Sequence, residues 1–123
     1  AAAIGPVRDM GTIAAADLTA NVNNWSPGTS TKSTVVIRVK TDAGGDRTIT
    51  GIDHDSLLSC EMLIIYNIGA FPNIDNVVLA HLSASSDADN QVNSSVSAAS
   101  YLIPPGATLK LVRDTVSDNW LIV

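Results

Sequence analysis

Short runs in which apolar and polar residues alternate begin near residue 34 and continue to the end of the chain. In residues 34–40, Val35, Ile37 and Val39 occupy every second position, which is the period of a strand with one buried face. Similar short runs follow, separated by residues typical of turns, at 47–52, 61–67, 76–81, 101–103, 107–113 and 119–123. We therefore expect an all-β fold with very little helix.

The regular spacing of these runs predicts an antiparallel β-sandwich or barrel, with a jelly-roll-like arrangement, over residues 34–123. Residues 61–67 contain four consecutive apolar residues, which indicates a central strand covered on both faces. Residues 61–67 and 76–81 are candidates for an antiparallel hairpin. Residues 83–100 are dominated by Ser, Ala, Asp and Asn, and we expect a long surface loop without regular structure.

The first 33 residues have a different texture. They are rich in Ala, Asn, Ser, Thr, Gly and Pro, and their apolar residues stand at irregular intervals. Because no period is sustained, we expect residues 1–33 to form an extended N-terminal arm and residues 34–123 to form the β-domain. The candidate apolar anchors of this arm are Ile4, Val7, Met10 and Ile13.

The last run alternates up to the C-terminal residue. Trp120 and Ile122 would lie on one face of a strand, and Leu121 and Val123 on the other. A frayed apolar strand would be prone to aggregation. We therefore expect these four residues to lie inside a sheet or at a subunit interface.

Charge narrows the range of partners. The chain has 7 Lys and Arg residues against 12 Asp and Glu residues, and its formal net charge is −5. This balance opposes the phosphate neutralisation that drives nucleic-acid binding, so we expect neither nucleic acid nor a membrane surface as a partner. Residues 1–6 lack the basic start of a signal peptide, and we expect synthesis in the cytoplasm of the producing cell.

The densest polar cluster places His54 between Asp53 and Asp55. An imidazole beside two carboxylates is able to ligate a metal ion or to act as a base. Adjacent side chains on a strand or turn diverge, however, and no second histidine motif lies nearby. A solvated loop is the favoured interpretation.

A second polar cluster contains Asp87, Asp89 and Asn90, whose oxygen atoms suit calcium. The central Gly and terminal Glu of the full calcium-loop signature are missing. We therefore expect no bound metal and no cofactor.

His81 is followed by Ser83 and Asp87, which are the residue types of a Ser-His-Asp triad. The sequence has no nucleophile elbow and no oxyanion motif, so a small hydrolase that uses His81 or His54 is disfavoured and we expect no enzymatic activity. A strand-end histidine that bonds the adjacent loop is the favoured interpretation. The single cysteine, Cys60, has no partner for a disulfide and is interpreted as a semi-buried hydrophobic residue.

Several turn motifs occur in a fixed order along the chain. They are the Asn67-Ile68-Gly69 turn, His81 followed by the Ser/Ala-rich residues 83–90, and the Pro105-Gly106 turn. Together with residues 23–28, 35–39 and 49–52 and the terminal Trp120, they resemble, over roughly residues 21–123, a β-module of tailed-bacteriophage virion proteins. The chain departs from that pattern at Gln91, where similar sequences often have Arg, and in the insertion-like residues 93–100.

The resemblance implies a structural role on a virion. Such modules occur in tail fibres, head fibres and capsid decoration proteins, generally as trimers. Because this chain holds one β-domain and an arm without shaft segments, we expect a decoration, or cement, protein. It would form a homotrimer, bind the major capsid protein on the outer capsid surface and stabilise the shell.

The alternative is a tail-fibre or receptor-binding module. In that case residues 83–100 would face glycans or proteins of the host surface. Glycan sites usually present aromatic side chains, and this loop has none, which disfavours the alternative.

Overall fold

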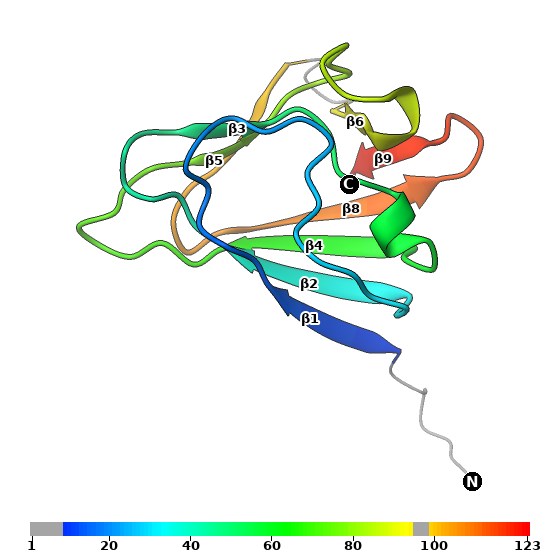
Figure 1. Ribbon diagram of the computed structural model, residues 1–123, viewed down its shortest axis with the longest axis horizontal. Coiled ribbons are helices and arrows are strands. Elements are labelled where there is room, and N and C mark those ends of the chain that lie inside the picture. The colour runs from blue at the N-terminus through cyan, green and yellow to red at the C-terminus, as the bar shows by residue number, and fades with distance from the viewer. Residues whose placement is uncertain (1–8, 95–98) are drawn as a thin grey trace, which may run out of the picture.

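The computed structural model describes residues 9–94 and 99–123, which form a β-solenoid of about 4 turns (Figure 1). The strands are β1 (Met10–Ala14), β2 (Thr34–Val39), β3 (Arg47–Ile49), β4 (Met62–Asn67), β5 (Val77–Leu79), β6 (Val92–Asn93), β7 (Tyr101–Ile103), β8 (Thr108–Asp114) and β9 (Asn119–Ile122). Two short 3-10 helices, η1 (Asp55–Leu57) and η2 (Ala88–Asn90), are the helical elements of these residues. Neither helix is long enough to cross a membrane. The prediction of an all-β chain is confirmed.

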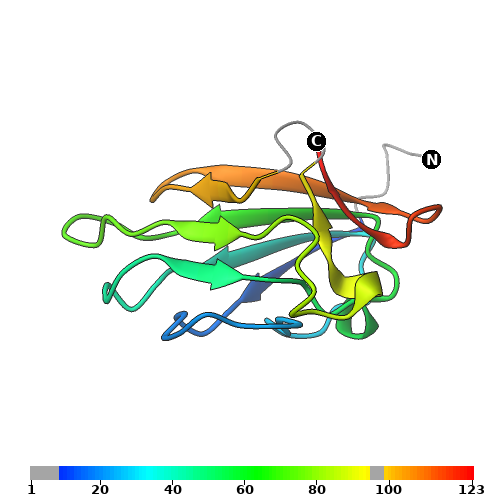
Figure 2. The same ribbon diagram turned by 90° about the horizontal axis from the view of Figure 1, so that it is seen from above.

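Two sheets form the walls of the solenoid. One sheet has six strands in the order β1-β2-β4-β8-β9-β6, and the other has three in the order β3-β5-β7. Consecutive turns pair in parallel, since β1 pairs with β2, β2 with β4, and β3 with β5. Figure 2 shows these turns stacked one above the next, from the blue first turn through cyan to green.

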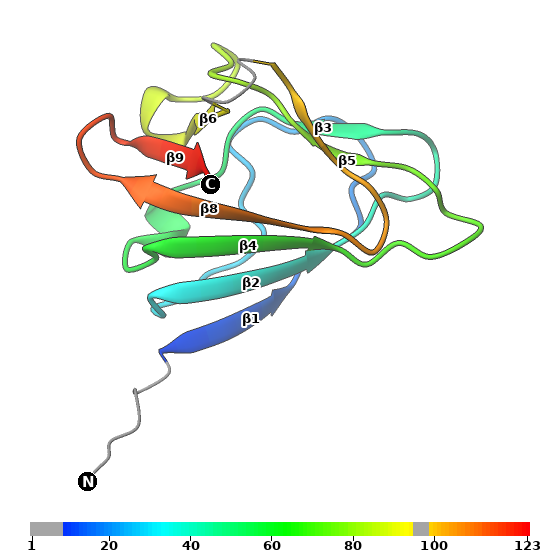
Figure 3. The ribbon, with the colours of Figure 1, turned by 180° about the vertical axis from the view of Figure 1, so that it is seen from behind.

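The last turn reverses this direction. Strand β7 pairs antiparallel with β5, and β8 pairs antiparallel with β4. Strand β9 then runs antiparallel to β8 and parallel to β6 (Figure 3). The chain therefore ends inside the six-stranded sheet.

The predicted antiparallel sandwich or barrel is wrong. Alternation along a strand reports which face is buried, but it does not report the direction of the neighbouring strand. Strands β4 and β5 lie in different sheets, so the proposed hairpin between residues 61–67 and 76–81 does not form. The expectation that residues 61–67 are covered on both faces is also wrong. Leu63 and Ile65 are buried in the core, whereas the residues on the opposite face of β4 are half-buried.

The extended arm is also wrong for residues 9–33, which form the first turn of the solenoid. Strand β1 pairs with β2, and further on Leu18 N donates to Lys40 O and Trp25 N donates to Gly51 O. Leu18 and Trp25 are buried in the core, with 5% and 6% of their surface exposed. The apolar residues stand at irregular intervals because Leu18 and Trp25 are buried singly, at isolated bridges outside the strands.

Aliphatic side chains from both sheets fill the interior. Val, Ile and Leu predominate, and Trp120 is the largest fully buried side chain. The expected surface loop at residues 83–100 is partly ordered, since it contains η2 and β6, and Ser86 and Asn90 within it are buried. Residues 95–98 of that loop lie outside the described residues.

Candidate functional site

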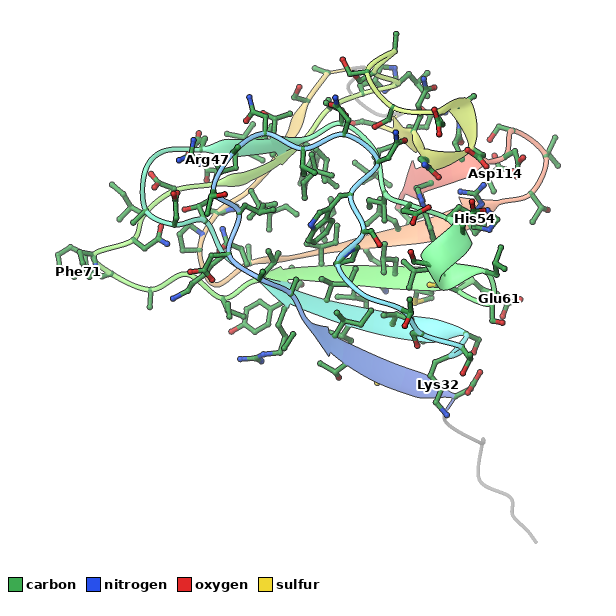
Figure 4. The ribbon with its side chains drawn as sticks, in the orientation of Figure 1. Lys32, Arg47, His54, Glu61, Phe71 and Asp114 are labelled. Carbon is green, nitrogen blue, oxygen red and sulfur yellow. The ribbon has the colours of Figure 1, made fainter. Side chains whose placement is uncertain are left out.

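The side chains of His54, Asp55 and Asp89 converge at one end of the molecule. One ligand atom of each, an imidazole nitrogen or a carboxylate oxygen, lies within 4.8 Å of the other two. His54 and Asp55 stand at the start of η1, whereas Asp89 belongs to η2. Figure 4 places His54 beside η1, at the end of the molecule opposite Phe71. We call these three residues the His54 cluster.

Asn90 holds the two segments of the His54 cluster together. Its backbone carbonyl accepts a hydrogen bond from Ile52 N at 2.8 Å, and its side-chain Oδ1 accepts one from His54 N at 2.9 Å. Its Nδ2 donates to Asn24 Oδ1 at 2.8 Å. Because Asn90 is buried, these bonds fix the backbone on both sides of the cluster.

Trp120 orients the imidazole of His54. The two rings meet edge to face, with centroids 6.2 Å apart and planes at 79°. Trp120 is itself fully buried, and its Nε1 donates to Ile52 O at 3.0 Å. The histidine ring therefore packs against a rigid part of the core.

Arg113 is a nearby cation, and its guanidinium contacts the backbone of the His54 cluster and not its carboxylates. It lies 5.1 Å from the Trp120 ring centroid, donates to the backbone carbonyl of Asp89 at 2.6 Å and pairs with the Asp118 carboxylate at 3.1 Å. It forms no ion pair with the carboxylates of Asp55 or Asp89 in the described structure.

Two polar clusters were identified in the sequence, and the His54 cluster of the structure contains residues from both. From the first, Asp53 is committed to its own turn, since it accepts bonds from Asp55 N at 3.1 Å and from Ser56 Oγ at 2.6 Å. The side chains of His54, Asp55 and Asp89 form no hydrogen bond with another described residue. Sequence reasoning missed the combination because η1 and η2 meet only through the stacking of successive turns.

His81 lies outside the His54 cluster. Its Nδ1 accepts a hydrogen bond from Ser94 N at 3.0 Å, as expected for a strand-end histidine that holds the adjacent loop.

The Asn67-Ile68-Gly69 and Pro105-Gly106 motifs of the sequence form turns that contact each other. Asn67 O accepts from Gly106 N at 2.8 Å, Asn67 Oδ1 accepts from Gly69 N at 3.0 Å, and Gly106 adopts a φ of 84° that favours glycine.

A second candidate site projects from the opposite end of the molecule. Residues 68–76, here called the Phe71 loop, connect β4 to β5 and form the leftmost tip in Figure 4. Phe71 is 91% exposed and Ile74 is 72% exposed. Large apolar side chains that are this exposed are candidates for contact with another molecule.

Polar side chains brace the base of the Phe71 loop. Asn73 Nδ2 donates to Thr41 O at 3.0 Å, and the Asp75 carboxylate accepts from Gly45 N at 3.0 Å. Asn67, which is buried in β4, donates through Nδ2 to Asp75 O at 3.2 Å. The loop therefore presents its apolar residues on a fixed support.

The predicted anchors and interface residues occupy different environments. Ile4 and Val7 lie outside the described residues, whereas Met10 is 52% exposed on β1 and Ile13 packs against the core. The terminal residues divide in the same way. Trp120 and Ile122 are buried in the chain's own core, Leu121 is half-buried and Val123 is exposed, so intrachain packing explains the first two without a subunit interface.

Cys60 has the environment of a structural residue. It is 2% exposed, and its Sγ donates to Met62 O at 3.1 Å. Burial raises the pKa of the Cys60 thiol to about 11. Because the thiolate is the nucleophile, the raised pKa disfavours reaction of this thiol at neutral pH.

No family model, no curated protein and no solved structure matches this chain. The inference of function therefore depends on the two sites described above and on the motifs in the sequence.

Proposed function

We propose that this chain is a structural attachment module of a tailed-bacteriophage virion, and that it decorates the outer capsid surface by binding the major capsid protein. The observation that carries the proposal is the Phe71 loop, with Phe71 91% and Ile74 72% exposed on a braced support. The order of turn motifs noted in the sequence supports the virion as the setting.

Rigid presentation favours binding because little conformational entropy is lost when the complex forms. An aromatic side chain that enters a pocket of the partner commonly contributes a large share of the binding energy. The Phe71 loop combines these features, since its apolar side chains are free while its polar side chains are committed to Thr41 and Gly45.

A decoration protein acts through binding energy alone. Copies that bridge neighbouring shell subunits stabilise the assembled state by mass action, since they bind it and not the dissociated subunits. In a homotrimer, which we propose for this chain, three Phe71 loops would act together and raise the apparent affinity. Ile4 and Val7 remain candidate additional anchors.

The test measures attachment of purified protein to undecorated phage heads, with Phe71→Ala and Ile74→Ala as the variants. Hot-spot substitutions of about 2 kcal/mol or more lower affinity roughly 30-fold or more, and we expect an effect of that order for Phe71→Ala. The matched control is Val116→Ala, because Val116 is 95% exposed in the loop between β8 and β9.

Circular dichroism and urea unfolding establish that each variant is folded. If folded Phe71→Ala and Ile74→Ala decorate heads with wild-type affinity, the Phe71 loop is not the attachment surface. If the wild-type protein binds tails or host cells and not heads, the chain is the tail-fibre or receptor-binding module and the decoration role is wrong.

A further inference from the structure

We propose that the His54 cluster is a binding site for a first-row divalent transition-metal ion, with zinc as the probe. The ligands are an imidazole nitrogen of His54 and carboxylate oxygens of Asp55 and Asp89, which lie within 4.8 Å of one another. The proposal is independent of the attachment role.

The ligand types select the class of metal. Imidazole nitrogen suits zinc and its neighbours in the first transition row, whereas magnesium and calcium prefer sites made of oxygen alone. Three protein ligands would leave a fourth position of a tetrahedral zinc ion for water.

The geometry requires only a small adjustment. Ligand atoms of a tetrahedral zinc ion stand roughly 3.3 Å apart when the metal-ligand distances are about 2.0–2.1 Å. The ligand atoms lie within 4.8 Å of one another, so metal binding would require side-chain rotations that bring them closer by about 1.5 Å at most. Asp55 is exposed and free to rotate, while the backbone of His54 is held by Asn90.

The electrostatics favour a cation at this place. Two carboxylates lie close together, and among the described residues neither forms an ion pair with a Lys or Arg side chain. The one nearby guanidinium, that of Arg113, is directed to the Asp89 backbone carbonyl and to Asp118. A bound dication would neutralise the mutual repulsion of the carboxylates.

Bound metal would link two turns of the solenoid. His54 and Asp55 follow β3, whereas Asp89 lies in η2 before β6. A ligand that binds the folded chain and not the unfolded chain raises the free energy of unfolding. Zinc is therefore expected to stabilise the protein against heat and urea.

The experiment uses the full chain after removal of metal with a chelator. Isothermal titration with zinc chloride is expected to show one site per chain, and thermal unfolding is expected to shift upward at saturating zinc. Magnesium and calcium at the same concentration should shift the transition little or not at all.

The diagnostic variants are Asp55→Asn and Asp89→Asn. Both keep the size of the side chain, and neither changes the residues of the contact between His54 and Trp120. Each should weaken zinc binding at least tenfold, as should His54→Asn if it folds. The matched control is Asp87→Asn, an exposed carboxylate that immediately precedes η2. Absence of one-to-one zinc binding would overturn the proposal, as would wild-type affinity in both diagnostic variants.

Discussion

The first and last turns of the solenoid end the fold in different ways. The first turn runs parallel to the second, and among the described strands β1 has a neighbour on one side only. The last turn reverses direction and places β9 between β8 and β6. Burial follows this difference, because no residue of β1 is fully buried whereas Trp120 of β9 is.

The difference shows two ways in which a terminal segment can be stabilised. In the first turn, the strand contributes little burial, and the inward side chains of Leu18 and Trp25 provide most of it. In the last turn, strand pairing on both sides and a buried indole act together. An edge strand such as β1 also presents unpaired backbone groups, so the first turn is the more open end.

Deletion of residues 1–33 gives the largest expected effect on this comparison. It removes two large buried side chains, each worth about 2–5 kcal/mol, together with the ladder between β1 and β2. The sum approaches or exceeds the whole stability of a domain of this size, about 5–15 kcal/mol. We expect the truncated chain to lose its cooperative urea transition. A cooperative transition with an unchanged midpoint would restore the arm interpretation.

The two tryptophans allow a matched comparison of the ends. Trp120 has no exposed surface and its Nε1 donates to Ile52 O, whereas Trp25 is 6% exposed. We expect Trp120→Ala to lower the free energy of unfolding by about 3–5 kcal/mol and Trp25→Ala to cost less, near 3 kcal/mol. Urea unfolding monitored by circular dichroism measures both.

Val123→Ala is the control, because Val123 is 63% exposed beside the same strand β9. Its expected effect is within about 0.5 kcal/mol. If Trp25→Ala proves more costly than Trp120→Ala, the first turn and not the last is the more tightly integrated end.

The sequence predicted individual strands better than their arrangement. Val35, Ile37 and Val39 are fully buried, as their alternation indicated. The partners of a strand depend on which residues the turns bring together, and alternation is the same in parallel and antiparallel pairs. The first turn was misassigned for a related reason, since Leu18 and Trp25 are buried at isolated bridges and have no period of their own.

The candidate sites were predictable to different degrees. The sequence analysis identified His54, Asp55 and Asp89 as candidate metal ligands in two separate clusters. Nothing in the sequence indicated that η1 and η2 lie close together. The exposure of Phe71 was not predictable either, because the sequence does not show whether an aromatic residue in a loop packs on the core or projects into solvent. Its environment depends on the bonds of Asn73 and Asp75, which point the loop outward.

The smallest expected effect concerns one carboxylate near the surface at each end of the fold. Ser33 N donates to Asp9 Oδ2 at 2.9 Å, and this bond lowers the pKa of Asp9 below its ordinary value of 3.8. At the other end, the Ser117 hydroxyl donates to Asp114 Oδ2 at 2.7 Å and is the main cause of the lowered pKa of Asp114. The two bonds close the first turn against β2 and the β8-β9 turn respectively.

A carboxyl group whose pKa is lower in the folded than in the unfolded chain stabilises the fold when it is ionised. Its contribution is complete above the unfolded value of 3.8 and is lost as the pH falls through the folded pKa. Asp9→Asn and Asp114→Asn should therefore lower the urea midpoint slightly at pH 7, and the difference from wild type should shrink below pH 3.8.

Asp17→Asn in the first turn is the control, since the Asp17 carboxylate accepts no hydrogen bond from another described residue. Because Asp9 is exposed and Asp114 is only partly buried, water screens their interactions, and the shifts should be smaller than those of either tryptophan variant. If the difference in urea midpoint between variant and wild type persists unchanged at acid pH, the amide disturbs the turn itself. Ionisation of the carboxylate would then not stabilise the turn at either end.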